Sequence, residues 1–415
     1  MSSLGKSQFD ADIGIVGAGV AGLTAARQLR TQGRTCVLLE ASHRIGGRAY
    51  TEWLQPGVPF DLGAHWIHSD ELNPFTQIAA ELDASVERDE EEYTAAEYFE
   101  DGEWLPKSAA QELADFADRQ FAAVIEAANQ GGSQSVFDVI DNDNRWAPYF
   151  CLFFGQDLSC DVDQVCVQDL AAYVEAGTDL AVGSGLGNLI QDYGADVPVS
   201  LNSTVLEIDS TGPGVRIVTA KGELRVAQAI VTVSTGVLAT QQIKFNPRLP
   251  ESKIAALNGL PMGSHTRVGL TFEGNFLHDL PDDFTIRSGD DEPLHFRNRP
   301  CGFDFVEVVA GGRLGSWMEK SGEHATLDLV EVYMKKLLGN DFAEKPSRHI
   351  ISAWDDDAWT KGAYSYALPG AAQQRRQLAE PIDQKIFFAG EATSTEFFST
   401  IHGAYFSALH AVSIL

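Results

Sequence analysis

The residues best suited to hold a cofactor form a glycine-rich turn near the start of the chain. Gly17, Gly19 and Gly22 stand in a G-x-G-x-x-G pattern directly after a short apolar segment. The first glycine permits a tight turn, the second lets the backbone approach a pyrophosphate, and the third allows close helix packing. Glu40 follows about 20 residues later, where a carboxylate can accept hydrogen bonds from ribose hydroxyls. The pattern predicts a dinucleotide-binding site but does not distinguish NAD from FAD.

A second polar turn follows, with the residues Arg44, Gly46, Gly47 and Arg48. Its two glycines let the chain pass close to a ligand, and Arg48 offers a planar set of donors to phosphate or flavin oxygens. A plain surface turn is the alternative interpretation of this segment taken alone. Its position directly after the second expected strand favours FAD.

The elements that must position these turns are indicated by hydrophobic periodicity. A strand at 12–16, a helix at 20–29 and a strand at 35–40 form a βαβ unit, which predicts a parallel sheet. Residues 73–129 change to an Ala- and Glu-rich sequence of helical period. Further strands and helices are expected at 197–201, 205–208, 215–219, 229–233, 267–272, 303–309, 327–338, 385–389 and 403–413. This order indicates two interleaved domains.

The charge of the chain is strongly acidic. Its 415 residues include 30 Lys and Arg against 59 Asp and Glu, a net charge of −29. Such a surface disfavours nucleic acid and anionic membranes as partners. Attraction of polycationic substrates and a general adaptation of the surface to solubility or high salt both remain open as explanations.

The cysteines and the hydropathy narrow the class of protein further. Five cysteines at irregular spacing predict neither a disulfide framework nor a zinc site. No basic segment followed by an apolar run opens the chain, and no stretch reaches the roughly 18 apolar residues that a bilayer requires. We therefore expect a cytoplasmic protein that holds no metal and does not enter a membrane.

The wider set of motifs is specific to one family. Residues 13–48 resemble the opening of the flavin-containing amine oxidases, a family that embraces monoamine oxidases, polyamine oxidases and lysine-specific histone demethylases. The resemblance is closest to the polyamine oxidases. Four further segments match in the family's order: FDLGAHWIH (60–68), AIVTVSTGVL (229–238), KGAYSYALPG (361–370) and IFFAGEATSTEFFSTIHGAYFSALHA (386–411).

The resemblance implies an α/β fold, with a Rossmann-like, glutathione-reductase-like FAD-binding domain interleaved with an α+β substrate domain. We expect the FAD-binding domain to comprise residues 1–72, 190–250 and 345–415, and the substrate domain to comprise 73–189 and 251–344. FAD is implied to be non-covalent, because Ala363 stands where monoamine oxidases carry their flavin-linked cysteine. The implied cofactor-binding residues are Gly17, Gly19, Gly22, Glu40, Gly47, Arg48, Gly63, Ala64, Val205, Gly390, Glu391, Thr400 and Ala404.

The same comparison implies the residues at the reacting end of the site. Tyr364 matches one aromatic residue of the family's substrate cage, and Thr400 lies in the Thr-X-His-Gly-Ala pattern of polyamine oxidases and histone demethylases. His65 and Trp66 match the GAHW motif of the polyamine oxidases. His65 could guide an amine or simply be a packed, hydrogen-bonded histidine. Arg267 replaces the family's lysine, which holds a water at the flavin and assists reoxidation by oxygen. Arginine does not readily deprotonate, so this departure puts rapid oxidase turnover in doubt.

The implied activity is oxidation of an amine to an imine, which hydrolyses to an aldehyde and a shorter amine, with oxygen reduced to hydrogen peroxide. A small-molecule amine and oxygen are the expected partners, and a monomer and a homodimer both remain open. The alternatives are an oxidase of amino acids or other small amines, an FAD dehydrogenase with another acceptor, and a non-catalytic FAD protein. An amino-acid substrate would need an arginine facing its carboxylate, for which Arg267 is a candidate.

Overall fold

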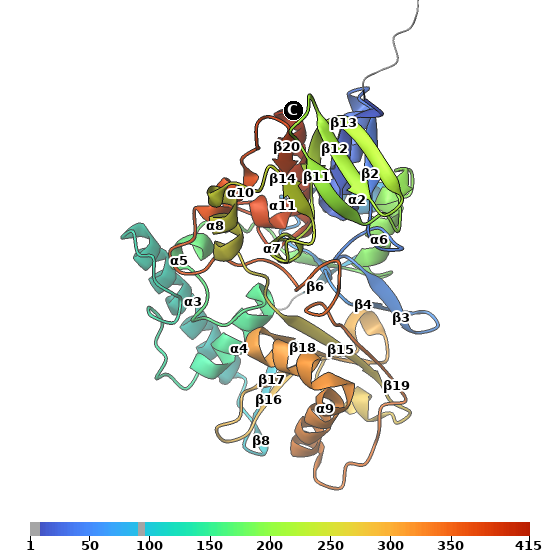
Figure 1. The fold of residues 1–415 in the computed structure, drawn as a ribbon. Helices are drawn as coiled ribbons and strands as arrows, with labels where there is room; N and C mark the ends of the chain where they lie inside the picture. The colour runs from blue at the N-terminus through green and yellow to red at the C-terminus, as the bar shows by residue number, and fades with distance from the viewer. Residues whose placement is uncertain (1–8, 90–95) are drawn as a thin grey trace, which may run out of the picture.

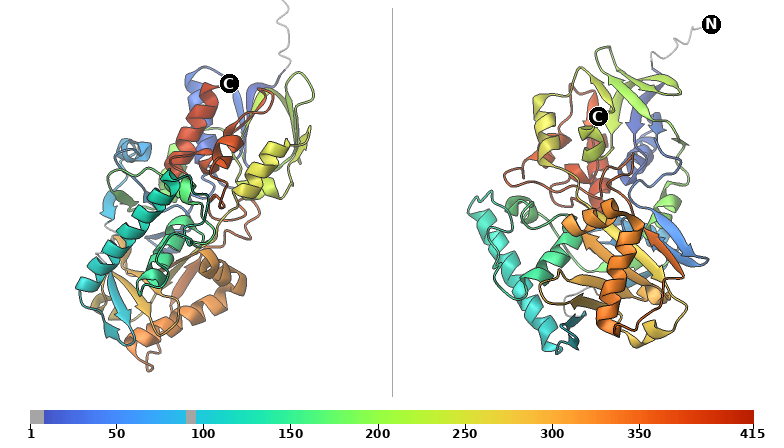
Figure 2. Two further views of the ribbon diagram at one scale, coloured as in Figure 1. Left: turned by 90° about the vertical axis from the view of Figure 1, so that its left-hand side faces the viewer. Right: turned by 60° about the horizontal axis from the view of Figure 1, so that its bottom comes forward.

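A computed structural model describes residues 9–89 and 96–415, and it contains two large sheets, one in each lobe of the molecule (Figures 1 and 2). The upper lobe in Figure 1 holds an eight-stranded sheet of order β10-β2-β1-β13-β12-β11-β14, in which β20 also pairs with β13. β1 pairs in parallel with both β2 and β13. The strands are β1 (Ala11–Val16), β2 (Cys36–Leu39), β10 (Val199–Ser200), β11 (Val205–Asp209), β12 (Val215–Thr219), β13 (Gly222–Val231), β14 (Lys244–Asn246) and β20 (Ile386–Phe388).

The centre of this sheet is buried, which explains why β1 is apolar along most of its length. α1 (Val20–Thr31) follows β1 through the glycine turn and packs against α11 (Ile401–Ser413). Leu23 of α1 and Ala408 of α11 lie in one core cluster. The strand predicted at 12–16 and the helix predicted at 20–29 are thereby confirmed, within two residues of their expected ends.

The lower lobe holds a seven-stranded sheet of order β19-β15-β18-β17-β16-β7-β8 (Figure 1). Every residue of β15 is buried, and α9 (Gly312–Leu338) packs against both β15 and β18. The strands are β7 (Glu97–Glu100), β8 (Glu103–Trp104), β15 (His265–Thr271), β16 (Asp283–Arg287), β17 (Leu294–Asn298), β18 (Val306–Gly311) and β19 (Arg348–Ile351).

β19 corrects one of the expected domain boundaries. We expected residues 345–415 to belong to the cofactor domain, but β19 pairs antiparallel with β15 in the other sheet. The boundary at 344/345 is therefore too early, because the chain completes the second sheet before it returns to the first. All eight strands of the first sheet lie within the ranges expected for the cofactor domain.

Helices form one side of the lower lobe. α3 (Ser108–Asn129), α4 (Ala147–Leu158) and α5 (Val167–Leu170) share an apolar core that includes Phe116 and Phe150. None of the helices in the described chain is both long and apolar enough to span a membrane. The remaining helices are α2 (Pro74–Glu81), α6 (Leu186–Gly194), α7 (Thr235–Ala239), α8 (Glu251–Gly259) and α10 (Gln374–Ala379), with short 3₁₀ turns at Phe276–Asp279, Pro300–Gly302 and Glu391–Thr393.

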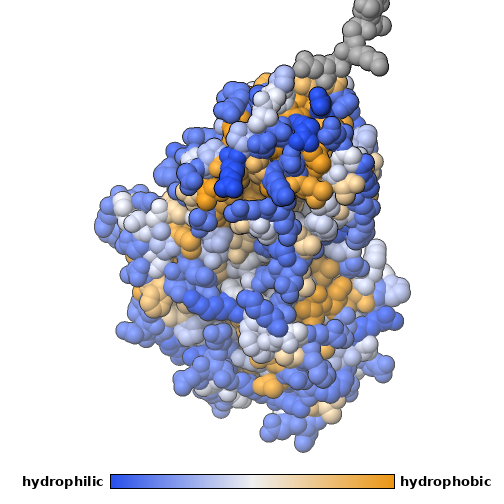
Figure 3. Space-filling view, viewed as in Figure 1, coloured by the Kyte–Doolittle hydropathy of each residue, from blue (hydrophilic) through white to orange (hydrophobic). Residues whose placement is uncertain are grey.

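Two small sheets complete the structure. β3 (Thr51–Gln55) and β4 (Val58–Asp61) form a hairpin, and β5 (Trp66–Ile67), β9 (Asp179–Val182) and β6 (Val86–Asp89) form a three-stranded sheet. The pairing of β5 with β9 brings the predicted motif at 60–68 close to residues more than a hundred positions later. Hydrophilic residues cover most of the face seen in Figure 3, in keeping with the acidic composition.

Candidate active site

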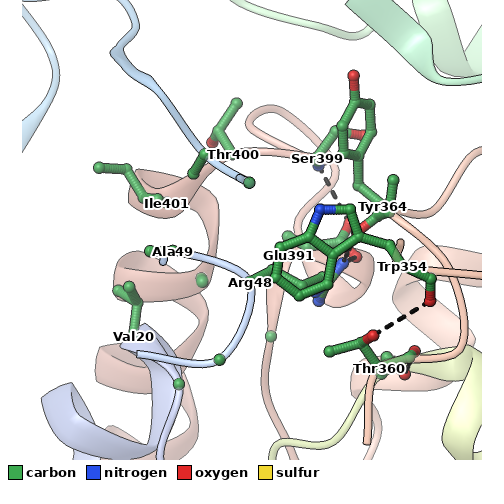
Figure 4. Close-up of a pocket in the computed structure, with 18 of the residues that line it drawn as sticks. Val20, Arg48, Ala49, Trp354, Thr360, Tyr364, Glu391, Ser399, Thr400 and Ile401 are labelled. Atoms are coloured by element: carbon green, nitrogen blue, oxygen red, sulfur yellow. Dashed lines mark hydrogen bonds and ion pairs between the residues drawn. The ribbon is translucent and has the colours of Figure 1, made fainter. Parts of the chain in front are cut away.

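A cavity of about 1040 Å³ lies between the two lobes. This volume is at the upper end of the roughly 300–1,000 Å³ typical of small-molecule sites. Its lining runs from Val16 to Ala404 and combines residues that follow strands of the first sheet with residues of the second sheet. Figure 4 shows part of the wall, where Thr400 and Ile401 lie across from Tyr364 and Trp354.

The glycine turn forms one end of the cavity. Gly17 has a φ of +104°, a conformation that L-residues rarely adopt. A Cβ atom added to Gly47 would lie 3.3 Å from the Cα of Gly19, so the two predicted turns touch through their backbones. The N–H groups at the start of α1 have no side-chain cap and face the cavity. The N-terminus of a helix without a side-chain cap offers backbone N–H groups and the positive end of the helix dipole. Both favour the binding of a pyrophosphate.

Glu40 is fixed at the rim of this turn. Its Oε2 accepts a 2.7 Å hydrogen bond from the N–H of Ala18, and its Oε1 accepts one of 2.8 Å from Ser42. A carboxylate oxygen has two lone pairs, so each oxygen retains one for a further donor. The buried carboxylate therefore fits the predicted contact with ribose hydroxyls.

Gly22 does not line the cavity. A Cβ atom there would lie 1.9 Å from the carbonyl oxygen of Gly17. Its contact with the cofactor stays a prediction, whereas the close packing that the pattern requires of the third glycine is present. The other predicted cofactor-binding residues line the cavity: Gly17, Gly19, Glu40, Gly47, Arg48, Gly63, Ala64, Val205, Gly390, Glu391, Thr400 and Ala404.

Arg48 is held by Glu391. Nη1 of Arg48 donates 2.8 Å hydrogen bonds to the carbonyl of Ala363 and to Oε1 of Glu391. Its Nε and Nη2 make no hydrogen bond with the described residues, which leaves donors for a ligand phosphate or ring oxygen. Glu391 also accepts hydrogen bonds from Ser365 and from the N–H of Ser399. Its carboxylate thus positions Arg48, a role that the motif alone did not reveal.

A buried ion pair between Arg375 and Asp169 stabilises the position of Glu391 through Ser365. Nε of Arg375 donates to Oδ1 of Asp169, and Nη2 donates to Oδ2, both at 2.8 Å. Nη1 of Arg375 reaches Oγ of Ser365 at 2.9 Å, and that hydroxyl donates to Glu391 at 2.7 Å. Although burial opposes it, the charges of Arg48 and Arg375 lower the pKa of Glu391 below its ordinary value. The network keeps Glu391 ionised.

Aromatic residues form the wall at the other end of the cavity. The hydroxyl of Tyr364 donates to the carbonyl of Gln156 at 2.7 Å, and burial raises the pKa of Tyr364 well above its usual range. Trp354 lies beside it in Figure 4 and donates from Nε1 to the carbonyl of Leu62 at 2.7 Å. The sequence predicted Tyr364 and Trp66 in this wall, but not Trp354.

His65 lines the cavity, yet both of its ring nitrogens are engaged. Nδ1 lies 3.1 Å from Oδ2 of Asp61, and Nε2 lies 3.1 Å from Nη1 of Arg297. Because arginine can only donate, Nε2 accepts and Nδ1 carries the proton. These contacts fit the packed, hydrogen-bonded histidine that was the alternative interpretation, and a role of His65 in catalysis stays a prediction.

Arg267 also lines the cavity, in a buried pair with Glu307. Its Nε donates to Oε1 of Glu307 at 2.7 Å, and its Nη2 contacts the same oxygen. The guanidinium carbons of Arg267 and Arg297 lie 5.5 and 5.2 Å from the ring centre of Trp66. Trp66 is held by two cations, and Arg267 is neutralised by its own carboxylate.

Thr400 lies on the wall, but its hydroxyl caps α11. It accepts from the N–H of Gly403 at 3.0 Å and donates to the carbonyl of Phe397 at 2.8 Å. Because the hydroxyl is engaged in these two bonds, the structure gives no support to its predicted role in catalysis. Thr400 does line the cavity, as expected.

An acidic group in the cavity was missed by the sequence. Asp157, Glu175 and Asp179 line the wall together with His68, whose Nδ1 lies 2.5 Å from Oδ2 of Asp179. Burial and the neighbouring carboxylates raise the pKa of Asp157 to about 7. These acids come from α4, a loop and β9, so their spacing in the sequence does not predict that they meet in one cavity wall. Within residues 9–89 and 96–415, no three His, Cys, Asp or Glu are placed to bind a metal ion.

Comparison with known proteins gives a consistent result. The family model described as flavin containing amine oxidoreductase matches residues 105–415, and one described as an NAD(P)-binding Rossmann-like domain matches 15–82. Polyamine oxidase 3 of Oryza sativa subsp. japonica is 30% identical over 96% of this chain and 87% of that protein. Polyamine oxidase 2 of Arabidopsis thaliana is 28% identical over 96% of this chain and 86% of its own length. A solved putrescine oxidase double mutant has the same fold, with a TM-score of 0.79, 18% identity and coverage of 97% and 98% of the two chains.

Proposed function

We propose that this chain, which belongs to the family of flavin-containing amine oxidoreductases, uses its FAD to oxidise an amine that carries a second positive charge. FAD-dependent amine oxidation is the activity of the family. The proposal concerns the substrate, and the observation that carries it is the acidic group at Asp157, Glu175 and Asp179. The relatives named polyamine oxidases support the same substrate class.

The glycine turn, Glu40 and Arg48 are the residues that would hold FAD. The uncapped start of α1 fits the pyrophosphate, Glu40 fits the ribose and the unused donors of Arg48 fit a phosphate or flavin oxygen. FAD, when bound, accepts the hydride that leaves the carbon next to the nitrogen. The protein must position the amine and remove its proton.

The cavity lining favours a substrate with more than one ammonium group. Tyr364, Trp66 and Trp354 provide a low-dielectric wall that favours the neutral form of the reacting amine. An amine with a pKa near 10 costs about 3–4 kcal/mol to deprotonate at neutral pH, so this desolvation offsets part of the cost. Asp179 remains ionised, because its pKa is lowered by His68 even though burial opposes the shift. Asp179 and Glu175 would attract the distal ammonium group.

An amino-acid substrate is disfavoured by the same cavity. Arg267, the candidate partner for a substrate carboxylate, already binds Glu307 through Nε and Nη2. Three further carboxylates in the wall would repel an anion.

Anaerobic reduction of the flavin tests the substrate class directly. We would follow its visible absorbance with putrescine, spermidine, spermine, N-acetylated polyamines, simple monoamines and amino acids. We expect polyamines to bleach it at the lowest concentrations, and Glu175→Gln to raise the concentration needed for polyamines more than for monoamines. Equal effects on both classes, or bleaching by amino acids alone, would refute the proposed substrate class.

We also propose that oxygen accepts the electrons and gives hydrogen peroxide. The sequence resemblance places Arg267 where the family has the lysine that assists this step, so we expect the wild-type protein to reoxidise slowly. Arg267→Lys should accelerate reoxidation when air is admitted to the reduced protein. Reoxidation of the wild type as fast as the variant would show that arginine does not limit this step.

A further inference from the structure

We infer that Asp157 is the group that accepts the proton from the substrate ammonium before its C–H bond is oxidised. The inference rests on the proposed function and adds a catalytic residue to it. In this step the N–H⁺ bond breaks, its electron pair stays on nitrogen, and the proton forms an O–H bond on the Asp157 carboxylate. The products are a neutral amine and a neutral carboxylic acid, so the charges cancel.

The first argument is position. Asp157 lies in the last turn of α4, directly after Gln156, whose carbonyl anchors the Tyr364 hydroxyl. Both Asp157 and Tyr364 line the cavity. The carboxylate therefore stands next to the aromatic wall where the reacting amine would lie. The carboxyl end of a helix carries partial negative charge, which favours a protonated acid there.

The second argument is the absence of a protein donor. The Asp157 carboxylate makes no hydrogen bond with any described residue and is open to the cavity. Asp179 differs, because its carboxylate accepts from His68 and from the N–H of Ser69. A carboxylate that lines a cavity and has no protein donor is available to a ligand that brings N–H groups.

The third argument is electrostatic, and it depends on the groups around Asp157. Glu175 and Asp179 raise its pKa together with burial, whereas His68 and His295 lower it, with a net value of about 7. The hydroxyls of Tyr173 and Tyr364 also face it, and both have raised pKa values. A base whose pKa lies near the working pH is the most effective proton acceptor.

Three other groups in this wall are not suited to take the proton. Both nitrogens of His65 are engaged, Arg267 remains a cation, and the Tyr364 hydroxyl is already protonated. Glu175 is a second carboxylate of the same wall, and it serves as the matched control because its proposed role is to bind the distal ammonium group.

The test is the pH dependence of anaerobic flavin reduction at saturating amine, measured for wild type, Asp157→Asn, Asp157→Glu and Glu175→Gln. At neutral pH we expect Asp157→Asn to slow the limiting rate by about 10²-fold. The defect should shrink as the pH rises above about 10, where most of the amine is neutral in solution. Asp157→Glu should retain most of the rate. Glu175→Gln should raise the half-saturating concentration and move the pH profile to lower pH, because Glu175 helps to raise the pKa of Asp157.

A second measurement separates proton transfer from binding or folding. With monoamines of decreasing basicity, the penalty of Asp157→Asn should shrink, because a weakly basic amine arrives neutral. FAD content and the flavin spectrum should match those of the wild type. A penalty that is the same at all pH values and for all amines would overturn the inference, as would an unchanged limiting rate. If no amine reduces even the wild-type flavin, the proposed function itself fails.

Discussion

The hydroxyl of Tyr364 donates a 2.7 Å hydrogen bond to the backbone carbonyl of Gln156, which joins the loop after β19 to the end of α4. Because the hydroxyl is used in this bond, the ring of Tyr364 is the part that it presents to a ligand. Its two neighbours are also fixed, since the Ala363 carbonyl accepts from Arg48 and the Ser365 side chain lies between Arg375 and Glu391.

Substitutions at Tyr364 should separate the ring from the hydroxyl. Tyr364→Phe keeps the ring and loses one hydrogen bond, so we expect a loss of about 1 kcal/mol in stability and a small change in flavin reduction. Tyr364→Ala should slow flavin reduction about tenfold or more while FAD content is retained. Stopped-flow absorbance of both variants checks this, and unchanged kinetics in Tyr364→Ala would remove the residue from the site.

The buried pair of Arg375 and Asp169 should be needed for stability. Arg375→Met leaves the Asp169 carboxylate buried without its cation, which costs about 3–5 kcal/mol. The exposed pair of Arg313 and Asp163 is the control, and Arg313→Met should cost less than about 1 kcal/mol. Chemical denaturation of the FAD-bound protein compares the two. Equal losses would mean that the buried network has no special role.

Gly22 should tolerate no side chain. In Gly22→Ala the new Cβ atom would lie 1.9 Å from the carbonyl oxygen of Gly17, so the glycine turn must shift. We expect a loss of about 1–3 kcal/mol in stability and weaker retention of FAD during gel filtration. Gly212→Ala is the matched control, since nothing lies within 4 Å of its added Cβ. The steric argument fails if the two variants retain FAD equally.

Asp157 should reduce stability at high pH in the absence of substrate. Its pKa is raised in the folded state, so the folded carboxyl holds its proton more tightly than the unfolded one. Stability is lost as the pH rises from about 4 to about 7, and the loss persists above that. Asp157→Asn should therefore raise the Tm at alkaline pH and leave it unchanged at about pH 4.

Thermal melts over this pH range check the sign. Asp118→Asn, at an exposed position of α3, is the control and should show no such pH-dependent gain. A gain in Asp157→Asn that is the same at both pH values would argue against a raised pKa.

The flavin should leave the protein on acid precipitation. Ala363 has no group that can bond to the ring, and no cysteine is among the described residues that line the cavity. We expect yellow supernatant and a colourless pellet. Flavin that stays in the pellet would contradict non-covalent binding.

The sequence predicted many of the residues that line the glycine-turn end of the cavity, for a physical reason. The turn at Gly17 and Gly19 needs glycine whatever surrounds it, and a strand buried on both faces needs a continuous apolar run. These constraints act within a few residues, so they are visible in one sequence. The cavity wall accordingly contains nearly all of the predicted cofactor residues.

The polar contacts were less predictable because they depend on partners far along the chain. Nε2 of His65 accepts a hydrogen bond from Arg297. The carboxylate of Glu391 accepts hydrogen bonds from Arg48 and Ser365. Asp157 becomes important only because α4 ends at the cavity. None of these outcomes is encoded in local spacing, and each required the tertiary structure.

The pairing of α1 with α11 has a consequence for how the protein is made. α1 leaves the ribosome long before β20, which pairs with β13, and α11, which packs against α1. At roughly 5–20 residues per second, tens of seconds separate their synthesis. During that interval Leu23 of α1 lacks the residues of α11, such as Ala408, that belong to the same core cluster. The part of the cavity wall between α1 and α11 is therefore complete only after α11 has been made, which places FAD capture after the synthesis of that helix.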